Sequence, residues 1–377
     1  PDAQESRGLG DVYKRQISDD TGTEGDKITS DTSLTISGTG EVGASVQVSL
    51  GGSEVGSAVT VDSDGNWSYT HGSTLSAGNN SFTAVATDAA TNASSASSAY
   101  VVTVDTTAPT ITIDQIATDD TLNASETGSP LVVSGTTTAE DGQTVTLTVN
   151  GKTFAGLVSG GEYSIGLSAK EVSTLTGTET FAVNVSDVAA NAATEVTRDL
   201  TVDTTGPTIT AVATSGTGIT SGAGNLNAGD AVTITLTASA ATTISGGTPT
   251  LSLSGGGQAN YSSGSGSTSL VCSSTGASGE NTADLEVIGF NTGGATLEDA
   301  EGNALVTSGS IANPTGTLLI DTTVPTVTSV VASGSGISNG SGDQKQSEAI
   351  TLTVNTSEAI TVDTSGGTPC LLYTSDA

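Results

Sequence analysis

Aspartate and asparagine recur at a fixed spacing in this chain, and their oxygens are the ligands that a hard divalent cation prefers. Three segments have the form Asp-x-x-x-Asn and cover residues 88–92, 187–191 and 299–303. Each is followed, after one strand-length segment, by a further aspartate: Asp105, Asp203 and Asp321. Calcium takes six to eight oxygens from carboxylates, amides and carbonyls. The repeated pattern therefore predicts structural calcium sites, and we call these two sets the Asp–Asn loops and the junction aspartates.

Acidic clusters at the starts of the first two repeats add to the ligand supply: Asp19, Asp20, Glu24, Asp26 and Asp31, then Asp114, Asp119, Asp120 and Glu126. An Asp–Asn loop and the junction aspartate after it could share one end of a domain only if the chain folds back. The strand order favours a loop that faces the opposite end, toward an acidic cluster after the previous junction, and both pairings stay open. The predicted ligands are Asp19, Asp20, Asp26, Asp88, Asp105, Asp114, Asp119, Asp120, Asp187, Asp203, Asp299 and Asp321.

A plainer interpretation stands beside the metal hypothesis. Asp and Asn favour turns because their side chains hydrogen-bond to the nearby backbone, and surface acidity keeps a chain soluble. The third repeat has only Asp230 near its start, which weakens the expectation of a site between the second and third repeats.

Other motifs that match catalytic or binding signatures resolve into turns. Residues 62–65 read Asp-Ser-Asp-Gly, but the bidentate glutamate of a calcium-binding EF-hand loop does not follow. Ser338 has the spacing of a nucleophile elbow, yet the only histidine, His71, lies far away in the sequence. The glycine-rich residues 38–43 precede a strand where a dinucleotide site needs a helix. Cys272 has no histidine partner and is expected to pack as a small apolar residue.

Carboxylate pairs are abundant, so the residue types that glycosidases use for acid–base catalysis are present. A sugar-binding cleft, however, also needs aromatic side chains on which the sugar stacks. Aromatic residues make up only 3% of the chain, and most fall at expected core positions. We therefore predict that the protein is not an enzyme.

The elements that must position these side chains are short strands. Apolar residues alternate with polar ones, as in residues 46–50, 82–86, 145–149, 181–185 and 232–236, and such period-two patterns indicate half-buried strands. About seven short strands per repeat favour an antiparallel β-sandwich. The one helix-like stretch is 168–175. Trp67 and Tyr163, each after a tight turn, are predicted to fill equivalent core positions.

A junction motif marks the repeats: residues 104–110, 202–208 and 320–326 share the form Val/Ile-Asp-Thr-Thr-x-Pro-Thr. Proline has no N–H to donate to a β-sheet, so each x-Pro pair predicts a boundary where the last strand of one domain passes into the first strand of the next. We expect an all-β fold of tandem immunoglobulin-like antiparallel β-sandwiches in a beads-on-a-string array. The expected domains are 17–105, 106–203, 204–321 (a second subtype) and a truncated fourth at 322–369.

The two ends have a different origin. Residues 11–16, Asp-Val-Tyr-Lys-Arg-Gln, are a translation of the transposase-end DNA used in sequencing adapters, and residues 370–377 translate its reverse complement. We predict that residues 1–16 and 370–377 are translated adapter and exclude them from the fold.

Charge limits the partners. The formal net charge is −32, which repels nucleic acid and anionic membrane surfaces. The sequence contains no apolar run long enough to cross a bilayer. We therefore expect neither nucleic-acid binding nor membrane insertion, and a cation would relieve the self-repulsion.

The junction VDTTAPTITI, the hairpin DSDGNWSY, the pair VNGKTF…GGEYSI and the loop TDAATN resemble the bacterial Ig-like repeats of giant type I-secreted surface adhesins. The run GGTPTLSL…NTADLEV…LEDAEGN…GTLLIDTT resembles a further subtype from the same proteins. The resemblance implies an extracellular, cell-surface extender that packs against neighbouring repeats, projects a distal binding domain and is stiffened by calcium near its junctions. Two other functions remain open: a glycan- or cell-binding Ig-like module, and accessory modules of a secreted hydrolase.

Overall fold

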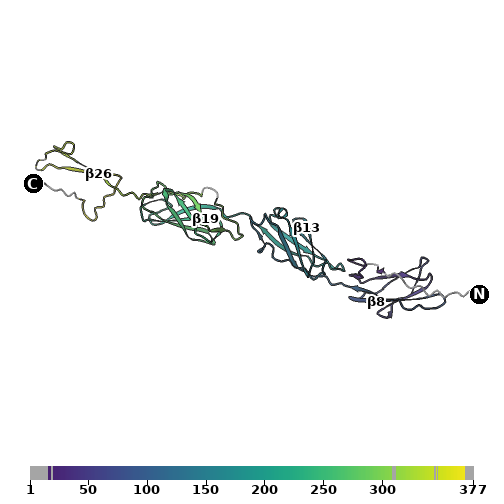
Figure 1. Cartoon of the computed structure of the whole chain (residues 1–377). Helices are drawn as coiled ribbons and strands as arrows, with labels where there is room; N and C mark the ends of the chain where they lie inside the picture. The colour runs from purple at the N-terminus through teal and green to yellow at the C-terminus, as the bar shows by residue number, and fades with distance from the viewer. Residues whose placement is uncertain (1–15, 18–19, 308–310, 344, 346, 370–377) are drawn as a thin grey trace, which may run out of the picture. The chain divides into compact units, whose positions relative to one another are not determined.

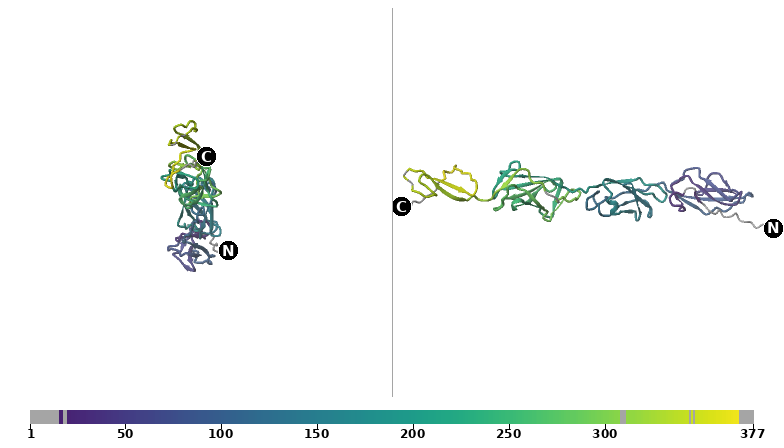
Figure 2. Two further views of the ribbon diagram at one scale, coloured as in Figure 1. Left: turned by 90° about the vertical axis from the view of Figure 1, so that its left-hand side faces the viewer. Right: turned by 90° about the horizontal axis from the view of Figure 1, so that it is seen from above.

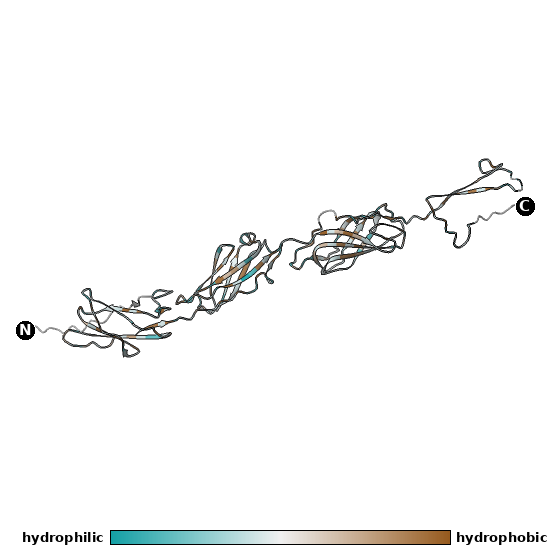
Figure 3. Cartoon of the chain, turned by 180° about the vertical axis from the view of Figure 1, so that it is seen from behind, coloured by the Kyte–Doolittle hydropathy of each residue, from teal (hydrophilic) through white to brown (hydrophobic). Residues whose placement is uncertain are grey.

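Strands make up nearly all the regular structure of the chain in the computed structural model, which describes residues 16–17, 20–307, 311–343, 345 and 347–369 (Figure 1). The chain divides into two compact units, residues 1–205 and 206–377. Two further views of the ribbon show strands and loops in both units (Figure 2). Along the strands, apolar residues alternate with polar ones (Figure 3), as the period-two pattern predicts. Each unit is described by itself.

The first domain is a sandwich of two sheets. One sheet has the order β1-β3-β7, and the other has the order β2-β9-β8-β4-β5, with β6 paired to β4. The strands are β1 (Gln16–Ile17), β2 (Ile28–Thr29), β3 (Thr35–Thr39), β4 (Ser45–Leu50), β5 (Ser53–Glu54), β6 (Val59–Thr60), β7 (Asn66–Thr70), β8 (Gly78–Thr87) and β9 (Tyr100–Val104). The inward residues of both sheets, among them Ile36, Val46, Trp67 and Phe82, form one buried core.

The second domain repeats this plan. β11 and β14 pair as a small sheet, against a second sheet of order β10-β16-β15-β12-β13. The elements are β10 (Thr121–Leu122), β11 (Leu131–Thr136), β12 (Thr144–Val149), β13 (Lys152–Leu157), β14 (Glu162–Leu167), α1 (Ala169–Val172), β15 (Gly177–Asn184) and β16 (Val196–Val202). The helix falls inside the predicted stretch 168–175, and Ser168 and Glu171 form a capping box at its start. Tyr163 occupies the core, as predicted.

The second unit begins with a larger sandwich. Its main sheet has the order β17-β19-β22-β21-β20-β23, with β24 on β19, and β18 pairs with β25. The elements are β17 (Ile209–Ser215), β18 (Gly224–Leu226), β19 (Ala231–Ser245), β20 (Thr250–Leu253), η1 (Ser254–Gly256), β21 (Gln258–Ser263), β22 (Ser267–Thr275), β23 (Val287–Asn291), β24 (Thr296–Glu298) and β25 (Leu318–Ile320). The 15-residue β19 changes register between Thr237 and Thr242, and it pairs with β22 on both sides of this irregularity. Cys272 is buried in the core, as predicted.

One feature is common to all three sandwiches: a short strand near the start of the domain pairs in parallel with the last strand. These pairs are β2 with β9, β10 with β16, and β18 with β25. The N–H of each junction aspartate then donates to the short strand of its own domain. Asp105 donates to Thr29 O (2.9 Å), Asp203 to Leu122 O (3.0 Å) and Asp321 to Leu226 O (2.9 Å). The junction aspartate is thus fastened to the sheet of the domain that it ends.

The last described segment is a hairpin of β26 (Val327–Ser333) and β27 (Thr351–Thr356). Its apolar residues stay exposed, with Val330 at 50% and Leu352 at 46%. In the part of the chain that the structure describes, no helix is long and apolar enough to cross a membrane.

Candidate metal site at the junction of the first two domains

The three Asp–Asn loops share one geometry. In each, the aspartate carboxylate accepts hydrogen bonds from the backbone N–H and the side-chain amide of the asparagine four residues later. In the second domain, Asp187 Oδ1 lies 2.8 Å from Asn191 N, and Oδ2 lies 2.9 Å from Asn191 Nδ2. The same pair of contacts measures 2.8 and 2.8 Å for Asp88 and Asn92, and 2.7 and 3.3 Å for Asp299 and Asn303. The aspartate therefore holds its own loop closed.

The backbone of these loops explains why they need such a clamp. The residue before the asparagine has a positive φ: 68° at Thr91, 68° at Ala190 and 83° at Gly302. A non-glycine residue in this region costs free energy, which the hydrogen bonds of the aspartate offset. Bonds from Asn92 also hold the pKa of Asp88 below its usual range. The turn-forming role of Asp and Asn thus accounts for the spacing without a metal.

The loop of the second domain makes a further set of contacts, with the first domain. Asn191 Nδ2 donates to the carbonyl oxygen of Asp105 (2.8 Å), and Thr21 Oγ1 donates to the carbonyl oxygen of Ala189 (2.6 Å). Gly22, with φ +79°, lies so close that a Cβ atom there would be 1.9 Å from Val188 O. The loop therefore packs on the junction aspartate and the starting loop of the first domain.

These contacts bear on the two pairings that the sequence left open. The loop of the second domain lies at the end where the chain enters that domain, beside the previous junction aspartate. In the second unit the arrangement is similar: a Cβ on Gly206 would be 2.0 Å from Ala304 O, and Val306 N donates to Pro207 O (2.8 Å). The acidic region that the loop of the second domain contacts belongs to the first domain, around Asp20, and not to the cluster after the junction.

The cluster after that junction has other partners. Asp120, with φ +64°, forms a bidentate ion pair with Arg198: Nε lies 2.6 Å from Oδ1, and Nη2 lies 2.5 Å from Oδ2. The Arg198 guanidinium holds the pKa of Asp120 below its usual range. Asp114 Oδ2 accepts from Ser134 Oγ (2.8 Å), and Asp119 Oδ1 accepts from Thr121 N (2.9 Å). The pairing of Arg198 with Asp120 was not predicted from the sequence.

The other predicted ligands each bond to their own backbone nearby. The junction aspartates accept from the N–H two residues on, at 2.9 Å each: Asp105 from Thr107, Asp203 from Thr205 and Asp321 from Thr323. Asp26 Oδ1 accepts from Ile28 N (2.8 Å). Asp19 lies outside the described residues.

Asp20, beside the contacts between the first two domains, has an unsatisfied carboxylate oxygen. Its Oδ2 accepts from Gly25 N (2.7 Å), but its Oδ1 is buried and has no hydrogen-bond partner among the residues that the structure describes. Buried carboxylate oxygens cost free energy unless a donor or a cation compensates them. Glu140, which the sequence analysis overlooked, adds a carboxylate here: its Oε2 accepts from Val188 N (3.2 Å).

A cation here would depend on more than carboxylates. Among the described residues, no group of three or more His, Cys, Asp or Glu side chains gathers at a spacing that could hold a metal ion. The residues present fit a calcium ion in part: Asp20 offers a buried oxygen without a partner among the described residues, and the next two residues, Thr21 and Gly22, lie against the carbonyl oxygens of Ala189 and Val188. Calcium accepts such mixed oxygen ligands.

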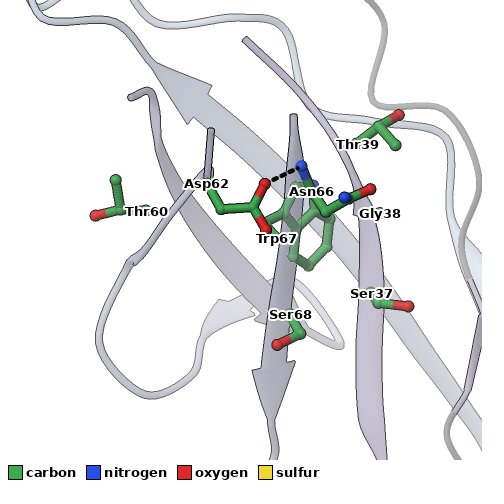
Figure 4. Close-up of a pocket in the computed structure, with 8 residues that line it drawn as sticks. All are labelled: Ser37, Gly38, Thr39, Thr60, Asp62, Asn66, Trp67 and Ser68. Carbon is green, nitrogen blue, oxygen red and sulfur yellow. Dashed lines mark hydrogen bonds between the residues drawn. The ribbon is translucent and has the colours of Figure 1, made fainter. Parts of the chain in front are cut away.

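Two chemical alternatives can be judged from their surroundings. Burial raises the pKa of the Cys272 thiol to about 11, so at neutral pH it is not the thiolate that nucleophilic chemistry requires. A pocket of about 540 Å³ lies beside Trp67 and is lined by Ser, Thr, Asp and Asn side chains (Figure 4). Trp67 is only 3% exposed, and it presents no face on which a sugar could stack.

Two family models match the first part of the chain. Residues 11–106 match a family model described as "Bacterial Ig-like domain", and residues 65–156 match one described as "Bacterial Ig-like domain (group 3)". The chain contains bacterial Ig-like domains. The second match runs from β7 of the first Ig-like domain into β13 of the next, across the junction.

Several solved structures are similar to these Ig-like domains. A bacterial immunoglobulin-like domain from the M. primoryensis ice-binding adhesin is 36% identical and covers 25% of this chain and 96% of its own, with a TM-score of 0.21. A structure concerned with host cell surface retention of a bacterial ice-binding adhesin is 23% identical and covers 84% and 100%, with a TM-score of 0.45. A Ca²⁺-stabilized adhesin with which an Antarctic bacterium binds ice is 27% identical and covers 85% and 77%, with a TM-score of 0.41. All three TM-scores lie below 0.5, and the family assignment rests on the family models. A search among curated proteins found no significant match.

Proposed function

We propose that this chain is a structural extender segment of a large bacterial cell-surface adhesin, working outside the cell to hold a distal binding domain away from the surface. It performs no catalysis, and its partners are the neighbouring Ig-like repeats of its own chain. The observation that carries the proposal is the direct contact between two consecutive domains, where Asn191 Nδ2 donates to Asp105 O. A linker that bonds to the next domain restricts bending, which a spacer needs and a flexible tether lacks.

Two further contacts support a restricted junction. Thr21 Oγ1 accepts from Ser30 N (2.7 Å) and donates to Ala189 O (2.6 Å), so one hydroxyl joins the end of β2 in the first domain to the Asp–Asn loop of the second. Gly22 leaves no room for a side chain against Val188. Both contacts involve backbone atoms of the Asp–Asn loop, and the clamp of Asp187 on Asn191 fixes these atoms in place.

We further propose that calcium stiffens this junction. Asp20, Glu140 and Asp187 would supply carboxylate oxygens, and Asn191 and Asp105 amide and carbonyl oxygens. The unpaired, buried Asp20 Oδ1 is the observation that favours a cation, and the net charge of −32 makes any cation favourable. A bound ion would neutralise carboxylates contributed by two domains and so would stabilise the contact between them.

Small-angle scattering of the full chain, first in calcium and then in excess chelator, tests both proposals. An extender held by calcium gives a longer and more rigid particle in calcium than in chelator. A rigid, extended particle in both solutions supports the extender and contradicts the calcium role. A flexible or collapsed particle in both contradicts the extender.

A matched pair of variants locates the ion. Asp20→Asn removes the negative charge of the carboxylate that contains the unpaired oxygen. Asp64→Asn makes the same change in an exposed hairpin turn of the same domain. We expect Asp20→Asn to weaken calcium binding by tenfold or more in calorimetric titration, and Asp64→Asn to leave it unchanged. Equal affinities in the two variants would place the ion elsewhere.

A further inference from the structure

The residue just before the short strand has the same backbone conformation in the first two domains. Lys27 has φ +66°, and Asp120 has φ +64°. The carbonyl oxygen of each accepts a hydrogen bond from the last strand of its own domain. Lys27 O accepts from Thr103 N (2.8 Å), and Asp120 O accepts from Thr201 N (2.9 Å). A non-glycine residue at positive φ costs free energy, so its recurrence at this position indicates that the surrounding contacts hold it there.

The side chain that faces this residue also comes from an equivalent position in the two domains. Tyr100 lies four residues before the end of β9, and Arg198 lies four residues before the end of β16. Each pairs across the sheet with a buried phenylalanine, Tyr100 with Phe82 and Arg198 with Phe181. The two sites are therefore equivalent in the backbone and in the residue beside them.

The side chains that meet at these equivalent sites differ in chemistry. In the first domain, Lys27 Nζ lies 5.0 Å from the centroid of the Tyr100 ring, and a cation is attracted to the face of an aromatic ring. In the second domain, Asp120 and Arg198 form the bidentate ion pair described above. The positive charge thus lies before the short strand in the first domain and on the last strand in the second.

An exchange of short strands between the two domains would bring the wrong side chains together. The backbone would accept the exchange, because β2 and β10 pair in parallel with their last strands in the same register. Both last strands also lead into the same sequence, Thr-Val-Asp-Thr-Thr. Lys27 would then face Arg198, and like charges repel. Asp120 would face Tyr100, whose ring face carries negative partial charge.

The third domain differs from both. The equivalent positions, two residues before the end of β18 and four before the end of β25, are Gly224 and Gly316. A Cβ atom on Gly224 would lie 2.5 Å from Gly218 O, and one on Gly316 would lie 2.7 Å from the carbonyl carbon of Gly222. Backbone fills both positions, so this site has no room for either of the two side-chain pairs.

We propose that the Lys27–Tyr100 and Asp120–Arg198 pairs are specificity determinants for strand pairing, which direct each short strand to the last strand of its own domain. Specificity requires repulsion in the wrong pairing as well as attraction in the right one, and these residues supply both. Strand exchange between neighbouring domains is a characteristic misfolding route of repeat proteins. The two pairs oppose that exchange between the first two domains. This inference does not depend on the extender function.

A disulfide that forms only after strand exchange tests the proposal in the full chain. Ile28 and Thr121 hold equivalent places, and Thr121 pairs with Thr201. Ile28→Cys and Thr201→Cys therefore meet only when the short strand of the first domain pairs with the last strand of the second. Cys272→Ala and Cys370→Ser remove the two natural thiols. This parent protein is unfolded under reducing conditions, refolded and then oxidised, and peptide mapping measures the crosslinked fraction.

A double variant and a matched control then change only the proposed determinants. Lys27→Asp combined with Tyr100→Arg gives the first domain the ion pair of the second, so each short strand finds a complementary partner in either domain. We expect the crosslinked fraction to rise about fivefold over the parent. The control adds Asp120→Lys and Arg198→Tyr, which exchanges the two pairs and restores the amino-acid composition of the parent. Its domains again differ, and we expect its crosslinked fraction to return to the parent level.

Two results would overturn the proposal. A crosslinked fraction that is the same in the parent and the double variant would assign the discrimination to the buried strand residues Thr29 and Leu122. A fraction as high in the control as in the double variant would show that lost stability, and not lost specificity, causes the exchange. If the double variant does not fold, Asp120→Lys with Arg198→Tyr replaces it. That variant gives both domains the lysine–tyrosine pair, and the same rise is expected.

Discussion

The carbonyl oxygen of Val188, in the second domain, lies 1.9 Å from the position that a Cβ atom on Gly22, in the first domain, would occupy. Backbone from one domain thus fills the space that a side chain on the other would need. Gly25, three residues later, has a similar positive φ of +91° but has open space around its Cβ position. Substitutions at these two glycines can therefore distinguish the effect of backbone strain from the effect of contact between the domains.

Gly22→Ala should therefore disrupt the junction, whereas Gly25→Ala should not. Both substitutions place alanine at positive φ and cost about 1 kcal/mol of first-domain stability. Only Gly22→Ala also displaces Val188, so only this variant should show independent tumbling of the two domains in ¹⁵N relaxation. Identical relaxation in both variants would mean that the domains do not contact each other at Gly22 in solution.

Asn191→Ala and Asn92→Ala form a second matched pair. Each removes the amide that an Asp–Asn loop uses to bond to its aspartate, with an expected loss of about 1 kcal/mol in the free energy of unfolding of its own domain. Asn191 also bonds to Asp105. We expect residual dipolar couplings to report a loss of fixed orientation between the first two domains only in Asn191→Ala. The same loss in Asn92→Ala would assign the effect to loop stability alone.

Tyr163 should make the second domain sensitive to alkali. Burial, and secondarily the negative charge of Asp114, raise its pKa to about 12, whereas a free phenol titrates near 10. The folded state holds the proton more tightly, so this contribution is complete below about pH 10 and is lost as the pH rises toward 12. Tyr163→Phe should lose about 1 kcal/mol at neutral pH and remove the alkaline transition from chemical denaturation curves. A transition that persists in the variant would point to another group.

Asp120 should contribute to the stability of the second domain, and this contribution should be lost in acid. Its hydrogen bonds with Arg198 hold its folded pKa below the ordinary value near 3.9. The contribution is therefore complete above that ordinary value and is lost as the pH falls through the lower folded value. Asp120→Asn keeps a residue that tolerates positive φ and removes the charge, with an expected cost of about 1 kcal/mol at pH 7 for this partly exposed pair.

Asp119→Asn is the control for that experiment, because Asp119 bonds only to a nearby backbone N–H among the contacts described. Denaturation at pH 7 and below pH 4 should show a difference between wild type and Asp120→Asn that shrinks in acid. A difference in the free energy of unfolding that does not change with pH would contradict a stabilising role of the Asp120–Arg198 ion pair.

The sandwich fold follows from local pattern. Alternation along residues 46–50 or 145–149 is a property of neighbouring residues, and a strand with one buried face satisfies it. The helical turn after Ser168 and the core positions of Trp67 and Tyr163 were predictable for the same reason: each depends on a turn or cap within a few residues.

The candidate site was predictable only in part, because it depends on contacts between distant residues. Thr21 and its partner Ala189 are 168 residues apart, and Asp120 and Arg198 are 78 apart, so spacing could not pair them. The repeated spacing singled out the aspartates of the Asp–Asn loops, and their role as metal ligands stays a prediction. Their carboxylates, however, are engaged by asparagine amides, which sequence alone does not distinguish from a bound ion. Glu140 gave no local signal, since it belongs to no repeated pattern.

The parallel pairing of first and last strands has a consequence under mechanical load. Tension enters a domain at one end of the chain and leaves it at the other, so it pulls β10 and β16 in opposite directions along their lengths. The hydrogen bonds between Thr121, Leu122, Thr201 and Val202, and that of Asp203 to Leu122, then resist sliding together instead of opening one by one. The same holds for β2 with β9 and β18 with β25. Each of these three domains therefore ends in a strand pair that tension along the chain would load in shear.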